Sequence, residues 1–445
     1  MNNEESGYFE EETVNNDITV QDKNKKIDNS NNENNEINNE NTANKEENND
    51  QKKNSMQNSG DKFDKFFPIQ DDKENNSNNN NLNNNNNNKI DNNEYKTNNP
   101  LDKYTEVPRT GLKNLGDISY LNAVLQSLGQ IEYLANYFLN EDIISKIESN
   151  IKENPLSFVT ERLFKHFYPF PPKLDIEIYD PKSYYRVLNS LNCTYNNYQR
   201  RNPNELLVFI LNTLHNELNS GDQNSNNMNI SQRNPQNEFN NFLANNKSII
   251  SEILAFCQWN EISCTNCNSS LSKFRAFNTY DLDIYNVYQN IGANRSLNIY
   301  DCLKYQLNKT QTLYCYSCQN KTSKNIKSKI VNGPKVFIFL LERGDTFDKS
   351  NQNFIIPFTI FEQIDLGEYI LEKKSSNNYE LTGIVSYSTN KQKYISFSKS
   401  PIKKEEWYVY DDTDANYNSF DDILKNHNDQ MTYIPCILYY TKIEN

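Results

Sequence analysis

The chain has 445 residues and a formal net charge of −13 at neutral pH, with 46 lysines and arginines against 59 aspartates and glutamates. Residues 1–104 contain 12 of the basic and 22 of the acidic side chains, so the rest of the chain is near neutral. We see no basic field of the kind that attracts nucleic acid, and no stretch approaches the roughly 18 apolar residues that cross a bilayer. We therefore expect neither nucleic acid nor a membrane as a direct partner.

Asparagine dominates the first 104 residues, and 78–88 is a nearly unbroken asparagine run. Such a segment buries too little apolar surface to offset the entropy lost on ordering, so we expect a disordered acidic tail over 1–104. One apolar island interrupts it, formed by Phe63, Phe66, Phe67, Pro68 and Ile69. The island is either a chance cluster in a biased composition or a short peptide that docks on a partner.

The eight cysteines come without a basic-then-apolar leader at the start of the chain. Reduced thiols in the cytoplasm or nucleus are therefore the default expectation.

Residues 111–128 predict a glycine-bearing loop that leads into an amphipathic helix. Gly111 and Gly116 permit unusual backbone angles, and Asp117 is a good N-cap for the helix. Leucines and a valine then recur at the spacing of one helical face. Ser119 falls in the first turn, where unpaired N–H groups and the helix dipole favour negative charge. This is a suitable place for a nucleophile that must ionise, although a cysteine would ionise far more readily than this serine.

Three further helices are predicted over 134–147, 155–167 and 202–218. The last has Asn202 as N-cap, a proline at the first helical position and Glu205 three residues after the cap. His215 lies beside its apolar stripe and is interpreted as a packed histidine at the helix edge. The polar, asparagine-rich segment at about 220–247 predicts a flexible insertion.

Two C-x-x-C motifs about fifty residues apart predict one structural zinc ion. Each motif supplies two thiolates from a tight turn, and a tetrahedral zinc site takes four. The alternative is four reduced, half-buried cysteines without metal. The other cysteines, Cys193, Cys257, Cys302 and Cys436, are interpreted as small core residues. The predicted zinc ligands are Cys264, Cys267, Cys315 and Cys318.

The C-terminal part alternates strand-like apolar runs with turns. Strand-like sequence is found in the following ranges: 274–283, 335–343, 354–361, 379–385, 407–412 and 435–440.

Several of these stretches, in this order, resemble those of the ubiquitin-specific proteases. Residues 111–128 resemble the family's cysteine box, with Ser119 at the nucleophile's position. Residues 200–205 resemble a second motif only in part, because Arg200, Arg201 and Asn202 stand where the family has two glutamines and an aspartate. The cysteine pairs resemble the ribbon in the family's fingers. Residues 379–412 resemble the histidine box, but Lys393 stands where the histidine belongs.

The resemblance covers residues 105–445 and implies an α+β, papain-like core of thumb, palm and fingers, with the zinc ribbon at about 255–330. It also implies the roles of four residues. Asn114 takes the oxyanion position, Ser119 the nucleophile position, Lys393 the base position and Asp411 that of the orienting acid. Ubiquitin or a ubiquitin-like protein is the implied partner.

With two of the three triad chemistries replaced, we expect an inactive, ubiquitin-binding member of the family. In a second hypothesis the domain is a scaffold in a large assembly, such as the splicing machinery, and no longer recognises ubiquitin. A third hypothesis is a weakly active hydrolase with a Ser119–Lys393 pair, or with a cysteine such as Cys193 as nucleophile. The pair requires a neutral lysine, and Asp411 beside it would favour the charged form.

Overall fold

The computed structural model describes residues 99–107, 109–171, 177–221, 234–291, 295–344, 352–373 and 376–444. The predicted tail, as far as residue 98, lies outside these ranges. The described chain opens with a short 3₁₀ helix, Pro100–Lys103, and the side chains of Leu101 and Tyr104 are buried in the core. Residues just before the expected boundary at residue 105 thus contact the core.

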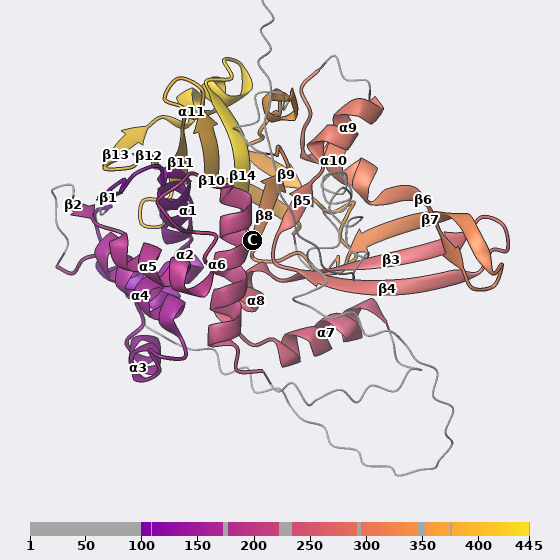
Figure 1. Ribbon diagram of the computed structural model, residues 1–445, viewed down its shortest axis with the longest axis horizontal. Helices are drawn as coiled ribbons and strands as arrows, with labels where there is room; N and C mark the ends of the chain where they lie inside the picture. The colour runs from indigo at the N-terminus through magenta and orange to yellow at the C-terminus, as the bar shows by residue number, and fades with distance from the viewer. Residues whose placement is uncertain are drawn as a thin grey trace, which may run out of the picture. The chain divides into compact units, whose positions relative to one another are not determined.

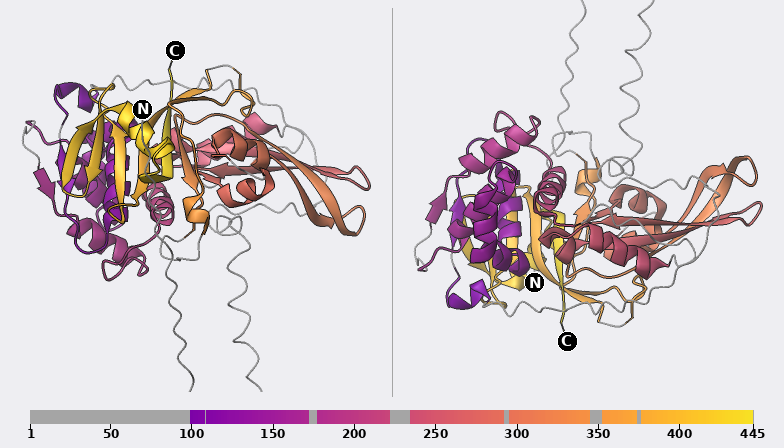
Figure 2. Two further views of the ribbon diagram at one scale, coloured as in Figure 1. Left: turned by 90° about the horizontal axis from the view of Figure 1, so that it is seen from above. Right: turned by 90° about the horizontal axis from the view of Figure 1, so that it is seen from below.

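Most helices of the N-terminal half gather on one face of a central sheet (Figures 1 and 2). Helix α4 spans the predicted residues, and α6 begins after the predicted cap Asn202, whose side chain accepts a hydrogen bond from the Asn204 backbone. The predicted helix 134–147 is instead two helices, because the chain turns at Asn140, which caps the second one. These helices are α1 Ser119–Gly129, α2 Glu132–Phe138, α3 Glu141–Ser149, α4 Pro155–Phe167, α5 Lys182–Leu191, α6 Pro203–Leu218 and α8 Ile249–Leu254.

Helix α1 is buried on every side rather than amphipathic, which corrects the sequence prediction. Its polar side chains form hydrogen bonds within the protein. Gln126 donates to the Thr110 carbonyl at 2.7 Å, and the Ser127 hydroxyl lies 2.8 Å from that of Ser396. These hydrogen bonds lower the cost of burying polar groups, although the amide oxygens of Asn122 and Gln126 are buried without a hydrogen-bond partner in the described part of the chain. Helix α1 is therefore the centre of the fold, and Ser119 opens it.

The central sheet has the strand order β13-β12-β11-β10-β14-β8-β5, and β9 pairs with β10 off this path. Side chains alternate between its two faces. Ile338 and Leu340 pack into the core beneath the helices, whereas Phe337 and Phe339 pack into a second core on the other face. The strands are β5 Tyr280–Leu282, β8 Val336–Leu341, β9 Gln363–Asp365, β10 Asn378–Ser388, β11 Lys393–Lys399, β12 Trp407–Asp411, β13 Asp414–Asn418 and β14 Tyr433–Lys442.

The second core lies between the sheet and the helices α9 Ile284–Ile291, α10 Ile299–Gln306 and α11 Phe420–Asn428. A short parallel pair, β1 Thr110–Leu112 with β2 Glu177–Tyr179, lies beside the loop that leads to α1. The predicted strand 354–361 does not form; this stretch contains a 3₁₀ helix, Gln352–Ile355, and a single β-bridge at Phe358. Its apolar residues alternate because they face the core from an irregular segment.

A separate antiparallel sheet, with the strand order β4-β3-β7-β6, extends away from the central sheet (Figure 1). It occupies the region expected to form the fingers. The expected insertion 220–247 is described from residue 234 onward, where helix α7, Pro235–Asn245, packs Phe239 against Cys257 at the base of this sheet. The strands are β3 Phe256–Cys264, β4 Ser270–Phe277, β6 Asn308–Cys315 and β7 Asn320–Ile330.

Candidate functional site

Ser119 is the first residue of α1 and is fully buried. Its Oγ accepts a hydrogen bond from the Tyr394 backbone N–H at 3.2 Å. The predicted N-cap was wrong: Ile118 occupies the cap position without a side-chain hydrogen bond. Asp117 instead pairs with Arg200, at 2.9 Å. The Ser119 hydroxyl thus lies at the positive end of a buried helix, as the sequence indicated.

Asn114 holds the loop before α1 in place. Its Oδ1 accepts hydrogen bonds from the backbone N–H groups of Gly116 and Ile118, both at 3.2 Å. Its Nδ2 donates to the Asp412 carboxylate at 3.1 Å. One N–H of the Asn114 amide, the predicted oxyanion donor, is therefore already hydrogen-bonded to the Asp412 carboxylate.

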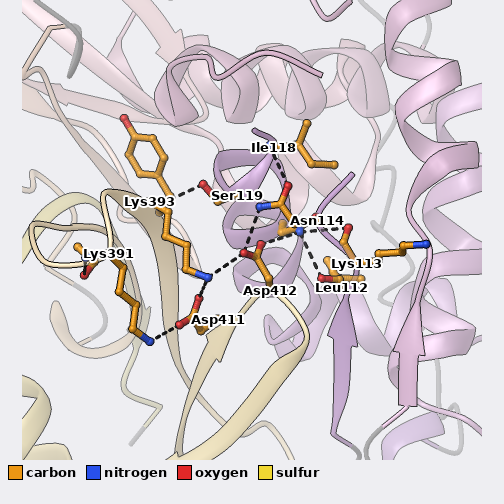
Figure 3. A network of polar contacts seen from close by, with 12 residues as sticks. Leu112, Lys113, Asn114, Ile118, Ser119, Lys391, Lys393, Asp411 and Asp412 are labelled. Carbon is orange, nitrogen blue, oxygen red and sulfur yellow. Dashed lines mark hydrogen bonds and ion pairs between the residues drawn. The ribbon is translucent and has the colours of Figure 1, made fainter. Parts of the chain in front are cut away.

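The side chain of Lys393 reaches toward two aspartates at the end of β12 (Figure 3). Its Nζ forms a short ion pair with Asp411 and lies 2.9 Å from the Asp412 Oδ2. Burial by itself would lower the pKa of Lys393, but the hydrogen bonds to Asp411 and Asp412 outweigh it and raise the pKa above its ordinary value. Lys393 is therefore protonated at neutral pH and has no lone pair with which to accept a proton.

Asp411 bridges two lysines. Its Oδ1 pairs with Lys393 and its Oδ2 with Lys391, which lies two residues earlier, before β11 begins (Figure 3). The Asp411 side chain is only 8% exposed, so the two ammonium groups compensate a nearly buried carboxylate. The sequence prediction did not include Lys391.

Asp412 connects three parts of the fold and was not among the predicted site residues. Its backbone adopts a φ of 56°, in the left-handed region. Its carboxylate accepts from Asn122 of α1 at 2.9 Å, besides Asn114 and Lys393, and its carbonyl accepts from the Leu112 N–H at 2.7 Å. In the sequence, only its position next to Asp411 pointed to Asp412. That position does not predict a left-handed backbone at a residue that is not glycine.

The loop that resembles the family's second motif only in part packs against the loop before Ser119. Arg200 pairs with Asp117, and the Tyr198 carbonyl accepts from the Asp117 N–H at 2.9 Å. A side chain at Gly116 would contact the Tyr198 Cβ at 2.9 Å, so the approach requires glycine.

A small pocket lies where the start of α6 meets β8 and Tyr394. Arg343 is the only charged side chain that lines it, and burial lowers the pKa of Arg343 to about 10. The remaining lining residues are Asn202, Pro203, Asn204, Leu341, Gly344, Phe354, Tyr394 and Cys436.

The four predicted zinc ligands converge at the end of the outlying sheet, and their Sγ atoms all lie within 4.8 Å of one another. The Sγ atoms of Cys264 and Cys318 are 3.8 Å apart, and those of Cys267 and Cys315 are 3.7 Å apart. Zinc–sulfur bonds of about 2.3 Å in a tetrahedron place the sulfurs about 3.8 Å apart. The geometry therefore fits one structural zinc ion.

Hydroxyl groups surround this cluster. Ser269 lowers the pKa of Cys315 to about 5, and Thr322 lowers the pKa of Cys264 to about 7, because each hydroxyl stabilises a thiolate. Both C-x-x-C turns are followed by a residue with positive φ, 58° at Asn268 and 52° at Gln319. The two turns thus have matching backbones.

The remaining predictions on cysteine and histidine can be compared with the structure directly. Cys257, Cys302 and Cys436 are buried as predicted, but Cys193 is exposed, which corrects its assignment to the core. His215 is packed at the edge of α6, where it contacts Ser248 at 2.7 Å. No helix in the described part of the chain is long and apolar enough to cross a membrane.

The fold and the cysteine cluster define a ubiquitin-hydrolase-like α+β protein with fingers. The family model of ubiquitin carboxyl-terminal hydrolase matches residues 110–440. The chain therefore belongs to this family, as a member of the ubiquitin-specific protease type.

Two curated relatives agree with this assignment. Ubiquitin carboxyl-terminal hydrolase 3 of Homo sapiens is 22% identical over 350 residues, which are 72% of this chain and 67% of the relative. The Mus musculus protein of the same name is 23% identical over 343 residues, 69% of this chain and 64% of the relative. The chain thus spans about two thirds of the length of these relatives.

Among solved structures, the fold is similar to a chain of the SAGA DUB module of Ubp8, Sgf11, Sus1 and Sgf73 bound to monoubiquitin, with a TM-score of 0.54 and 18% identity. The match covers 78% of this chain and 71% of that one.

Proposed function

We propose that this chain is a catalytically silent member of the family that binds ubiquitin or a ubiquitin-like protein. The observation that carries the proposal is the pairing of Lys393 with Asp411 and Asp412. This pairing supports the proposal because it holds a charged ammonium at the residue that the resemblance assigns to the base position.

Acyl transfer by this fold needs a nucleophile that a neighbouring base can deprotonate. A serine hydroxyl is much harder to ionise than a thiol, so Ser119 depends on a base more than a cysteine does. Lys393 cannot serve, because its raised pKa keeps it protonated. Loss of triad members costs about four to six orders of magnitude in rate, and what remains comes from binding and oxyanion stabilisation.

The support for ubiquitin binding comes from the family and the preserved scaffold. The family model spans the helices, the central sheet and the outlying sheet, and the similar solved structure is described as bound to monoubiquitin. The described zinc-ligand cluster would hold the tips of the fingers together.

The test is reaction of the full chain with an electrophilic ubiquitin C-terminal probe, beside a ubiquitin pull-down. We expect binding without a covalent adduct. The double variant Ser119→Cys/Lys393→His restores the family's residue types, and the single variant Ser119→Cys is its matched control. A covalent adduct on the unaltered chain would refute the proposed lack of catalysis. Absence of ubiquitin binding would refute ubiquitin as the partner.

A scaffold role in a larger assembly, without ubiquitin recognition, is the second candidate. It is favoured by the charge at the pocket beside Tyr394, where Arg343 is present and no carboxylate lines the wall. Arg201 adds positive charge close to Asn202 in the sequence, where the resemblance implies acidic groups that receive a basic ubiquitin tail, and Arg200 beside it is paired with Asp117. Co-purification with a ribonucleoprotein complex, together with no ubiquitin binding, would support it.

A weakly active hydrolase with a Ser119–Lys393 pair is the third candidate, and the ion pairs of Lys393 oppose it. A probe adduct at Ser119 that Lys393→Met abolishes would establish it.

A further inference from the structure

One face of the outlying sheet carries a row of aliphatic side chains. Residues paired in an antiparallel ladder share a face, and Leu271 of β4 pairs with Ile262 of β3, which pairs with Ile326 of β7. Leu313 of β6 pairs with Thr322, which has the same parity as Ile326 and so lies on the same face. We call this side of the four strands the finger face.

These aliphatic side chains belong to no hydrophobic core of the described residues. Leu271 is 51% exposed, and Ile262, Leu313 and Ile326 are half-buried. On the inner strand β7 this face is buried, as Thr322, Lys324 and Ser328 show, so its exposed part lies along β4 and β6. Exposed aliphatic side chains beside polar ones are typical of an interaction surface.

The rim of the finger face is basic. The exposed Lys273 and Lys309 lie on it together with Arg275, whereas Lys324 of the same face is buried; the ladder places no aspartate or glutamate there. Neither Lys273 nor Lys309 forms an ion pair with a carboxylate in the described ranges. An occupant of this face should therefore be acidic as well as apolar.

The opposite face of the same strands is different. Helix α7 lies at its base (Figure 1), and there Phe239 forms a hydrophobic cluster with Trp259 and Phe274. Farther out it carries serine, threonine and asparagine side chains, and the exposed Lys321 and Lys327 are accompanied by Glu261. It has basic residues but no comparable aliphatic row, so it provides a matched control.

We propose that the finger face binds residues 63–72 of this same chain, which contain the apolar island and lie outside the described ranges. This segment combines Phe63, Phe66, Phe67 and Ile69 with three aspartates, Asp64, Asp71 and Asp72, and with one lysine, Lys65, so its net charge is −2. Aromatic rings would cover the aliphatic row, and the aspartates would face the unpaired lysines. Charge and apolar character thus match on both sides.

The length of the connecting chain permits this contact. Asn99, where the described chain begins, lies 30 positions after Ile69. A chain of this length spans at most about 100 Å when extended and about 30 Å on average as a coil. Tethering also raises the effective concentration of the segment to the millimolar range, so a weak contact suffices.

The test uses the full chain with a photo-crosslinking p-benzoylphenylalanine in place of Gln70, beside the island, and mass spectrometry of the products. We expect crosslinks to β4 and β6 on the finger face, with a yield that does not depend on protein concentration. Lys273→Glu/Lys309→Glu should lower the yield about tenfold, or about 1.4 kcal/mol. The control Lys321→Glu/Lys327→Glu changes the opposite face and should leave the yield unchanged.

A second pair of variants tests the apolar half of the contact. Phe66→Ala/Phe67→Ala should remove the crosslinks, and Asn85→Ala/Asn86→Ala should not. Crosslinks elsewhere on the domain, or equal loss in both charge-reversal variants, would overturn the proposal. A yield that rises with concentration would assign the face to a second copy or another protein. The outcome does not depend on whether the chain binds ubiquitin.

Discussion

The two ends of the domain differ in which family residues they retain. In the outlying sheet all four cysteines are present, and their sulfurs lie at distances that suit tetrahedral zinc. In the site around α1, Ser119 and Lys393 occupy the positions that the resemblance assigns to the nucleophile and the base, and Asp411 pairs with Lys393. A metal site needs ligands and spacing alone, whereas a catalytic site also needs particular protonation states.

Under the proposed loss of catalysis, the framework of the site is nevertheless connected. Asp412 links α1, β1 and β12, and Asp411 has a cationic partner from β11. The ion pairs of Lys393 satisfy two nearly buried carboxylates that a neutral histidine would satisfy less well. The same contacts that stabilise the fold hold the lysine in its charged form.

Loss of the metal should have the largest effect. Cys267→Ser removes a ligand at the exposed edge of the cluster, and the control Cys193→Ser removes an exposed cysteine elsewhere. Because structural zinc contributes about 10–16 kcal/mol to the folding of isolated zinc modules, we expect the outlying sheet to lose its cooperative structure. Metal analysis should show one zinc per chain, retained in Cys193→Ser and lost in Cys267→Ser. If both variants kept one zinc per chain, the proposed zinc site would be wrong.

The buried contact between His427 and Ser386 should make the free energy of unfolding depend on pH. His427 Nε2 lies 2.8 Å from the Ser386 hydroxyl, and burial lowers the pKa of His427 to about 4. The unfolded chain takes up this proton near pH 6.5 and the folded chain only near pH 4, so stability is lost as the pH falls through this window. The loss between pH 7 and pH 4 should be about 3 kcal/mol. His427→Gln should lack this component in chemical denaturation, and the exposed control His166→Gln should keep it.

Removal of the Lys393 ammonium should destabilise the site. Lys393→Met leaves Asp411 with Lys391 alone and removes a cationic partner from Asp412. We expect a loss of about 2 kcal/mol, less than the 3–5 kcal/mol typical of fully buried pairs, because Lys393 is partly exposed. Urea denaturation measures it, with Lys404→Met, an exposed lysine, as control. An unchanged free energy of unfolding would show that Asp411 and Asp412 do not need the positive charge of Lys393.

The ion pair between Arg200 and Asp117, which joins the loop before α1 to the loop before α6, should contribute least to stability. Arg200→Ala breaks the ion pair with Asp117, whose side chain is 47% exposed. Ion pairs of this exposure contribute about 0.2–1 kcal/mol, and salt screens them. We expect a small drop in stability that shrinks as salt concentration rises. A salt-independent drop would instead assign the effect to lost packing of the Arg200 side chain.

Much of the domain could be predicted because local patterns and motif spacing are written directly in the sequence. The helix at 155–167, the cap at Asn202 and the four zinc ligands all follow from spacing and residue type. The strand prediction for 354–361 failed because alternation shows which residues face the core but not whether a neighbouring strand is available. The amphipathic reading of α1 failed because its polar residues find partners on other elements.

The sequence by itself indicated the family, the four cysteines that can hold zinc, and the serine and lysine at the positions that the resemblance assigns to the nucleophile and the base. Only the tertiary structure decided which groups surround these two residues. Ser119 accepts from the Tyr394 backbone, Lys393 is held by two acids, and Asp412 organises the loop before α1 from nearly 300 positions later in the chain. Strand register likewise sorted the lysines of the outlying sheet onto two different faces. These features depend on which distant residues meet, and one residue's pKa or exposure is set by neighbours that the linear order does not reveal.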